Sequence, residues 1–205
     1  MRILAIGDSL TAGYCLPPPF KPWAPVLSNL LPGKPAVDHI GCSGWTTSQL
    51  VAAADSASVE DVCGEEWPGT RTKLKSAQYD VGIIMGGTND LAYGVSAKDI
   101  VANLASLHQM CWDAGAVKTV LLSIPPSAGS GNPAHGAAND ALRAWAEAQG
   151  ASKVLFVDSS SLVPFARSSA LWMMDGLHMT AAGYEQFGTR LADAIAGFVA
   201  PGSGS

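Results

Sequence analysis

Four short segments of the sequence contain side chains that suit nucleophilic acyl transfer. That reaction needs a hydroxyl nucleophile, a base that takes its proton, a group that orients the base, and donors that stabilise the oxyanion. Gly7-Asp8-Ser9-Leu10 offers the hydroxyl of Ser9. Asp175-Gly176-Leu177-His178 places a carboxylate three residues before an imidazole, so Asp175 can reach the Nδ1–H of the ring and leave Nε2 free for a serine. These two segments predict a nucleophile and its base.

The other two segments could donate hydrogen bonds to an oxyanion. In Gly41-Cys42-Ser43-Gly44, a glycine without a Cβ lets a backbone N–H approach a ligand closely. Gly86-Gly87-Thr88-Asn89-Asp90 adds the side-chain amide of Asn89. Each of the four segments alone is typical of an ordinary turn or cap, but together and in this order they form a specific set.

Apolar runs of strand length precede these segments or lie between them. The five runs are residues 2–6, 37–40, 81–85, 117–124 and 154–157. Buried strands of a parallel sheet read as continuous apolar runs of this kind. Stretches of helical period alternate with them, at residues 23–31, 46–54, 97–114, 134–149 and 181–199, the last with Thr180 as its N-cap. The alternation predicts an α/β fold with a parallel sheet, helices on both faces, and a site at the carboxyl ends of the strands.

Two segments interrupt this alternation, at residues 14–25 and 55–78. The first contains five prolines, which exclude regular structure over most of its length. The second is a long mixed insertion of the kind that is often functional. Because each falls after a predicted strand, both are expected to flank the site.

Composition and charge narrow the class of protein. The chain has 205 residues, 48% of them hydrophobic and 14% charged, which favours a folded protein over a disordered one. This length predicts a single domain over residues 1–200. Residues 201–205 are expected to be a flexible tail, either a linker or a remnant of cloning. A net charge of −5 without a basic stripe disfavours nucleic acid as a partner.

Hydropathy predicts neither a membrane span nor an export signal. A span needs about 20 apolar residues. Only four apolar residues follow Arg2 before Gly7-Asp8, too few for a signal peptide. We therefore expect a cytoplasmic protein as the sequence stands, while a secreted mature form whose signal has been removed stays open. The sequence does not determine the oligomeric state.

The four cysteines form no CxxC pair and have no metal-ligand spacing with the four histidines. They are Cys15, Cys42, Cys63 and Cys111. We expect reduced thiols and no metal site. One or two disulfides in an oxidising compartment, with Cys63 as the first candidate, are the alternative.

The four chemical segments resemble the four blocks of the SGNH hydrolases, also called the GDSL esterase/lipase family. The first block extends here through Thr11-Ala12-Gly13, and the resemblance spans residues 3 to 187. It implies a three-layer α/β/α, flavodoxin-like fold with a five-stranded parallel sheet and no cofactor. The α/β-hydrolases also order their triad as Ser, Asp and His, but they need a Gly-x-Ser-x-Gly elbow that this sequence lacks.

The resemblance implies a role for each of five residues. Ser9 would be the nucleophile and, through its backbone N–H, an oxyanion donor. Gly44 would supply a second donor from its backbone, and Asn89 a third from its side chain. His178 would be the base, and Asp175 would fix its tautomer.

Three residues in or beside these segments are candidates for the substrate pocket. Trp45 directly follows Gly44 and is expected to line the substrate pocket together with Leu10 and Leu177. Cys42 competes as a nucleophile, although a buried structural thiol is the more common case.

Further polar residues favour structural roles. Asp8 and Asp90 are expected to hold the turns of their segments. No catalytic role is expected for His39, His108 and His135, because none has a carboxylate in a matching local setting.

The sequence thus predicts a serine ester hydrolase that works through an acyl-enzyme, with short-chain acyl esters as substrates and transfer to a second alcohol as a side reaction. The alternatives are a thioesterase or lysophospholipase for longer acyl chains, a carbohydrate acetylesterase with an aromatic platform built from Trp45 or Trp67, and a catalytically silent binding module.

Overall fold

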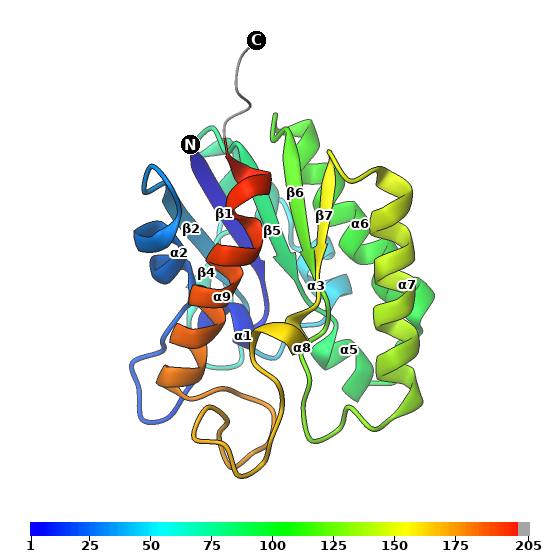
Figure 1. The fold of residues 1–205 in the computed structure, drawn as a ribbon. Coiled ribbons are helices and arrows are strands. Elements are labelled where there is room, and N and C mark those ends of the chain that lie inside the picture. Colours follow the sequence, from blue (N-terminus) through cyan, green and yellow to red (C-terminus); the bar gives the residue numbers. More distant parts are fainter. Residues whose placement is uncertain (201–205) are drawn as a thin grey trace.

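The computed structural model describes residues 1–200, and its main feature is a five-stranded parallel sheet (Figure 1). The strand order is β2-β1-β5-β6-β7, which is the flavodoxin-like order. The tail expected at residues 201–205 lies outside the described residues. The strands are β1 (Arg2–Gly7), β2 (Ala36–Gly41), β5 (Val81–Met85), β6 (Lys118–Leu122) and β7 (Val154–Val157).

Each strand of the sheet coincides with one of the five predicted apolar runs. The central strand β5 is buried along its whole length, because helices cover both of its faces. In β1, Ile3 and Ala5 face one hydrophobic core, whereas Leu4 and Ile6 face the other. Successive side chains of a strand point to opposite faces of the sheet. Because each face is covered by a hydrophobic core, the odd and the even positions of β1 are both apolar.

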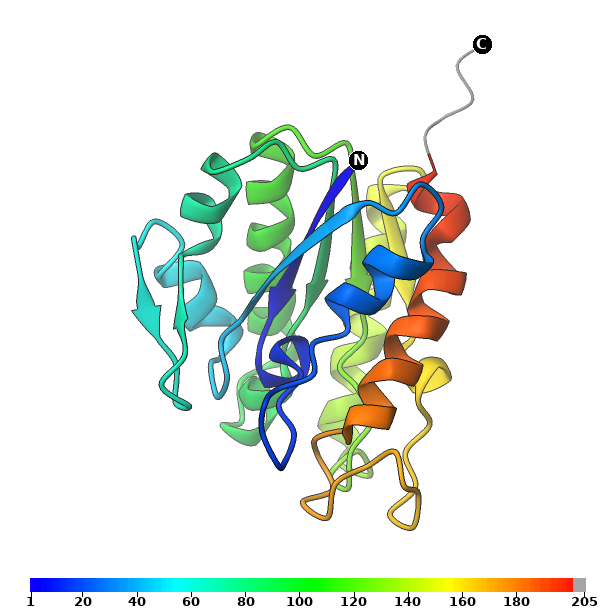
Figure 2. The ribbon, with the colours of Figure 1, turned by 90° about the vertical axis from the view of Figure 1, so that its left-hand side faces the viewer.

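Helices form a layer on each face of the sheet, which gives the three-layer α/β/α arrangement (Figure 2). On one face, Leu27 of α2 (Ala24–Leu30) and Leu191 of α9 (Ala181–Val199) pack on the core that contains Ile3. The other face is covered by α3 (Thr47–Ala52), α4 (Thr70–Lys75), α6 (Ala97–Asp113) and α7 (Pro133–Gln149). The predicted fold class is confirmed.

The insertion at residues 55–78 contains regular structure that the sequence pattern did not reveal. It forms a two-stranded antiparallel hairpin, β3 (Val59–Glu60) with β4 (Glu66–Trp67), followed by α4. Strands of two residues are too short to show a hydrophobic period. The predicted strand at 117–124 is also longer than β6, because the backbone N–H of Ile124 leaves the sheet and donates to Asn139 Oδ1.

The carboxyl ends of the five strands meet at one edge of the sheet, where the connecting loops and three short helices gather (Figure 1). These helices are α1 (Ser9–Ala12), α5 (Thr88–Ala92) and α8 (Ser159–Leu162). The loop before α9 returns to this edge, and α9 begins at the predicted cap, where Thr180 Oγ1 accepts from the Gly183 N–H. The predicted chemical segments therefore lie at the same edge.

Among residues 1–200, no helix combines the length and the apolar character that crossing a membrane requires.

Close packing at this edge predicts that Gly41→Ala destabilises the protein. A Cβ on Gly41 would lie 2.4 Å from the backbone N and 2.6 Å from the Cα of Ala12 in α1, and neither atom can move freely. We expect a loss of about 1–3 kcal/mol in the free energy of unfolding, measured by urea denaturation. Gly197→Ala in α9 is the matched control, because no atom lies within 4 Å of its added Cβ. Equal stability of the two variants would contradict the prediction.

Candidate active site

Ser9 is presented by a sharp strand-to-helix turn. β1 ends at Gly7, and Asp8 caps α1, with its Oδ1 accepting from the Leu10 N–H at 3.0 Å. The helix ends after one turn at Gly13, which adopts a left-handed conformation with φ 75°. Ser9 therefore sits in the first turn of a short helix at the sheet edge, and 6% of its surface is exposed.

Ser9, His178 and Asp175 form a continuous hydrogen-bonded line. Ser9 Oγ lies 3.0 Å from His178 Nε2, and His178 Nδ1 lies 2.8 Å from Asp175 Oδ2. The second carboxylate oxygen, Oδ1, accepts from the backbone N–H groups of Leu177 and His178 at 2.9 and 3.0 Å. Partial burial alone would raise the pKa of Asp175, but these N–H donors and the contact with His178 hold it below its usual value. The structure thus brings together the predicted nucleophile, base and orienting carboxylate.

Tyr14 supports the imidazole, a contact that the sequence did not indicate. Its ring centroid lies 4.6 Å from that of His178, at an angle of 50°. The Tyr184 hydroxyl in α9 donates to the Tyr14 carbonyl at 3.0 Å and holds this residue in place. The Met173 N–H also donates to the His178 carbonyl at 2.8 Å. His178 is therefore held from its ring face and from its backbone.

Three predicted hydrogen-bond donors lie in the segments that follow β1, β2 and β5. Within the described chain, neither the Ser9 N–H nor the Gly44 N–H donates to another protein group. Gly44 has φ 76°, a left-handed conformation that favours glycine. Asn89 Nδ2 donates one hydrogen to the Trp45 carbonyl at 2.8 Å, which leaves its second N–H for a ligand.

Asp90 connects the loops that carry these donors. Its Oδ2 accepts from the Thr47 N–H at 2.9 Å, and its Oδ1 accepts from Thr47 Oγ1 at 2.6 Å. Asp90 is fully buried, so it acts as a link between α5 and α3 rather than as a group that reaches solvent. The sequence suggested that Asp90 holds the turn of its own segment, whereas its carboxylate bonds to Thr47 in a different segment.

A cavity of about 230 Å³ opens beside Asn89 and Leu177. Its apolar walls are contributed by Leu91, Ala92, Ile124, Pro125 and Leu177, and its polar ones by Thr88, Asn89, Ser127, Asn132 and His135. Leu177 thus lines this cavity together with Asn89, whereas Ser9 and His178 are not among its lining residues.

The other two expected pocket residues lie elsewhere. Leu10 is 1% exposed and belongs to the core that contains Trp23, whose Nε1 donates to the Leu10 carbonyl. Trp45 is partly buried and packs against the core on the α3 and α6 side of the sheet. Leu10 and Trp45 each follow a residue of a turn, and a side chain at such a position can point toward either face of the sheet. The spacing of residues in the sequence does not determine which face it is.

The remaining histidines make contacts that do not involve Ser9. His108 is completely buried, donates to or accepts from Thr119 Oγ1 at 2.7 Å, and has a pKa lowered by burial to about 3. The His39 ring packs against Trp67. His135 Nε2 lies 3.1 Å from the Ile124 carbonyl oxygen, at the wall of the 230 Å³ cavity. No local pattern in the sequence indicates this position, because α7 brings His135 to the cavity from a distant part of the chain.

All four cysteines are free, and Cys63 alone among them is exposed. Burial, together with the Asp61 and Asp8 carboxylates, raises the pKa of Cys42 to about 12, so this thiol stays protonated at neutral pH. A nucleophilic cysteine must be a thiolate. Cys42 therefore does not compete with Ser9. No cluster of three or more His, Cys, Asp or Glu side chains in residues 1–200 is arranged to hold a metal ion.

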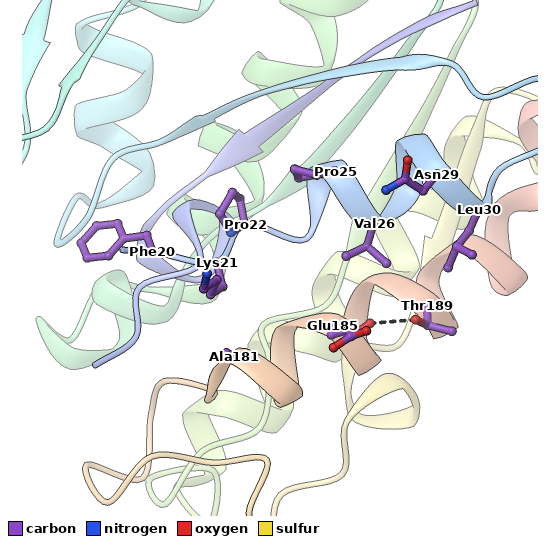
Figure 3. A pocket seen from close by; sticks show the side chains of 10 residues that line it. All are labelled: Phe20, Lys21, Pro22, Pro25, Val26, Asn29, Leu30, Ala181, Glu185 and Thr189. Carbon is purple, nitrogen blue, oxygen red and sulfur yellow. Dashed lines mark hydrogen bonds between the residues drawn. The ribbon is translucent and has the colours of Figure 1, made fainter. Parts of the chain in front are cut away.

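A larger cavity, of about 710 Å³, lies between α2 and α9 (Figure 3). Val26 and Leu30 of α2 line it opposite Glu185 and Thr189 of α9, and Thr189 Oγ1 donates to the Glu185 backbone oxygen. None of the five predicted site residues contributes to it. The larger cavity is therefore not the one beside the predicted site residues.

Comparison with known proteins finds one matching family. The profile of the GDSL-like Lipase/Acylhydrolase family matches residues 5–186. A search of curated proteins gives no significant match.

Solved structures of esterases and a lipase have the same fold. A lipase/acylhydrolase from Enterococcus faecalis is 22% identical, with a TM-score of 0.66 and all of both chains covered. The psychrotrophic esterase EstA from Pseudoalteromonas sp. is 20% identical, with a TM-score of 0.71 and 97% of this chain and 98% of that chain covered. A carbohydrate esterase family 3 protein from Talaromyces cellulolyticus is 19% identical, with a TM-score of 0.70 and coverage of 95% and 96%.

Asp8 is a buried carboxyl directly before the serine. Only 1% of it is exposed, and its Oδ2 has no hydrogen-bond partner within the described residues. Burial raises its pKa from 3.8 to about 7, and the nearby Asp90 charge contributes in the same direction. Folding thus favours the neutral acid.

The raised pKa predicts that Asp8 makes the protein less stable as pH increases. Between about pH 4 and pH 7 the unfolded chain releases the Asp8 proton while the folded chain keeps it. Deprotonation therefore stabilises the unfolded state relative to the folded state. From pH 4.5 to pH 8, we expect the wild type to lose on the order of 2–4 kcal/mol of stability relative to Asp8→Asn, which cannot titrate. Urea denaturation of both proteins at each pH measures the difference. The same pH dependence in wild type and variant would show that Asp8 does not titrate in this range.

Proposed function

Because the chain belongs to the GDSL-like lipase/acylhydrolase family and is an ester hydrolase, we propose that it cleaves short-chain acyl esters with Ser9 as nucleophile, His178 as base and Asp175 as the group that orients the base. One observation carries the proposal. The distances from Ser9 Oγ to His178 Nε2 and from His178 Nδ1 to Asp175 Oδ2, 3.0 and 2.8 Å, are those of a proton-transfer line.

Acylation begins with the attack of Ser9 Oγ on the ester carbonyl carbon. His178 Nε2 takes the hydroxyl proton, and Asp175 stabilises the imidazolium that forms. The tetrahedral intermediate then collapses, the imidazolium donates its proton to the leaving alcohol, and the acyl group stays on Ser9.

The negative charge of the tetrahedral intermediate falls on the former carbonyl oxygen. The N–H groups of Ser9 and Gly44 and the second hydrogen of Asn89 Nδ2 are the donors for that oxygen. Donors that already point at this oxygen stabilise its charge without having to reorient during the reaction. This electrostatic stabilisation accounts for much of the rate enhancement of many enzymes.

Deacylation repeats these steps with water in place of Ser9. His178 removes a proton from water, the hydroxide attacks the acyl carbon, and Ser9 recovers its proton as the acid leaves. A second alcohol that replaces water at this step would receive the acyl group, so transesterification uses the same residues.

A short acyl chain is supported by the cavity beside Asn89 and Leu177. Its volume, about 230 Å³, lies below the range of roughly 300–1,000 Å³ that is usual for sites holding drug-sized ligands. Polar side chains such as Asn132 and His135 form part of its wall. Such a cavity suits a few carbons better than a long aliphatic tail.

A carbohydrate ester is the second candidate, because aromatic side chains line a cavity that reaches α1. Trp67, Phe20 and His39 line a cavity of about 420 Å³ that also includes Ala12, one turn after Ser9 in α1. Flat aromatic faces can support sugar rings. Trp67, which the sequence suggested as part of such a platform, is therefore a candidate contact for a sugar leaving group, and the solved carbohydrate esterase with this fold is consistent with that idea.

Hydrolysis of p-nitrophenyl acetate tests the proposed function. The wild type is expected to release p-nitrophenol, and Ser9→Ala is expected to lower kcat by a factor of about 10⁴ or more, because the triad acts as a unit. Asn89→Ala should lower kcat by roughly 10²–10³, the loss typical of one oxyanion donor.

The folded state of each variant is checked by circular dichroism and thermal unfolding. An inactive wild type would favour a silent binding module, and equal activity of Ser9→Ala would rule out the proposed nucleophile. Unchanged turnover of Asn89→Ala would remove this residue from the site.

A series of p-nitrophenyl esters from acetate to palmitate tests the acyl-chain length. We expect kcat/KM to be highest for acetate to butyrate and to fall roughly 10-fold or more by octanoate, because extra methylenes overfill the cavity. Ala92→Phe, which narrows this cavity, should shift the optimum toward acetate. Ala181→Phe, which narrows the larger cavity between α2 and α9, is the matched control and should leave the profile unchanged. A rise toward palmitate would instead favour a thioesterase or lysophospholipase.

A further inference from the structure

A buried carboxylate fastens the hairpin β3–β4 to the loop that follows β2. Asp61 lies directly after β3, and 5% of its surface is exposed. The hairpin itself lies at the outer side of the molecule, on the face of the sheet that α3 and α4 cover (Figure 2). Asp61 therefore joins a peripheral element to the edge of the sheet where the proposed site lies.

Both oxygens of Asp61 are fully used by N–H donors. Oδ2 accepts from the Ser43 N–H at 2.9 Å and from Trp67 Nε1 at 3.1 Å. Oδ1 accepts from the N–H groups of Cys63 and Glu65 at 2.8 and 3.1 Å. Hydrogen bonds to an ionised acceptor are roughly twice as strong as neutral ones. One oxygen thus shapes the turn of the hairpin, and the other binds the turn to Ser43.

The hairpin also holds the carbonyl of Ser43. The Val62 N–H donates to Ser43 O at 3.3 Å, and the Val62 side chain lies over Gly44, so close that a Cβ on Gly44 would be 2.7 Å from Val62 Cγ2. The Ser43 carbonyl and the Gly44 N–H belong to the same peptide unit, which is planar and trans. A bond that orients this carbonyl therefore orients the Gly44 N–H in the opposite direction.

We propose that Asp61 is a positioning residue for the oxyanion hole, which it preorganises by fixing the Ser43–Gly44 peptide through the hairpin. The inference rests on the proposed function, since it assigns to Gly44 the role of oxyanion donor. Asp61 does not touch the reacting atoms. Its effect arises because a donor held in advance stabilises the transition state more than a donor that must reorganise.

Asp61→Asn tests this inference. An amide has one acceptor oxygen, so whichever way it turns, two of the four N–H groups lose their acceptor. We expect kcat for p-nitrophenyl acetate to fall on the order of 10- to 100-fold at unchanged KM, because a displacement of about 1 Å at a catalytic group can cost that much. A similar loss in kcat and kcat/KM identifies an interaction made in the transition state.

Counting active sites separates positioning from a general loss of folding. The number of sites is measured by complete phosphorylation of Ser9 with diethyl p-nitrophenyl phosphate and mass spectrometry. A purely structural role would lower the number of sites and leave kcat per site unchanged, which would overturn the proposal. Asp55→Asn is the matched control, because this exposed carboxylate of the same insertion pairs with Arg71 and does not touch Ser43. It should leave kcat per site unchanged.

A double-mutant cycle with Gly44→Ala tests the route through Gly44. The added Cβ displaces the backbone under Val62, so Asp61→Asn should have little further effect on kcat in this background. Full additivity of the two substitutions would overturn the proposal.

If Asp61→Asn does not fold, Trp67→Phe takes its place, since it removes one donor to Oδ2 and keeps an aromatic ring. It should lower kcat a few-fold at unchanged KM, and an unchanged kcat would overturn the proposal. If the wild type is active, Ser9→Ala is inactive and Asp61→Asn is fully active, this inference is refuted and the proposed function stands. An inactive wild type would refute the proposed function.

Discussion

Gly7, the last residue of β1, pairs with Gly41 of β2 on one side and with Met85 of β5 on the other. The Cys42 N–H then donates to the Gly7 carbonyl at 2.9 Å and extends the ladder by one residue. Because parallel strands in register end at the same level, the three loops that follow them start side by side. The serine, the glycine donor and the amide donor of the proposed site therefore depend on this register, and a shift of one residue would separate them.

Buried carboxylates hold these loops once they leave the sheet. Asp8 caps the helix that starts at Ser9, Asp90 joins the loop after β5 to Thr47, and Asp61 joins the hairpin to Ser43. A buried carboxylate is costly unless N–H or O–H groups satisfy it. Asp61 and Asp90 meet that condition with both oxygens, whereas Asp8 meets it with one. Burial raises the pKa of Asp8 to about 7.

The base reaches the same edge by a different route. His178 lies in the loop before α9, and it is held by Asp175 from its own segment and by Tyr14 from the proline-containing segment. Tyr14 is in turn bonded to Tyr184 of α9. The helix that covers one face of the sheet thereby fixes the loop that presents the imidazole. Packing of the outer layer and geometry of the site are thus coupled.

Local pattern in the sequence determined the five strands, the main helices and the identity of the residues in the Ser9–His178–Asp175 line. A continuous apolar run indicates that both faces of a strand are buried. The three-residue spacing of Asp175 and His178 indicates that their side chains can contact each other within one turn. Tertiary structure alone decided that Tyr14 supports His178, that Leu10 points into the core, and that Asp61 reaches Ser43. The contacts of Tyr14 and Asp61 join segments that are distant in the sequence. The direction of the Leu10 side chain depends on the conformation of the turn before it. A local hydrophobic period contains no information on either property.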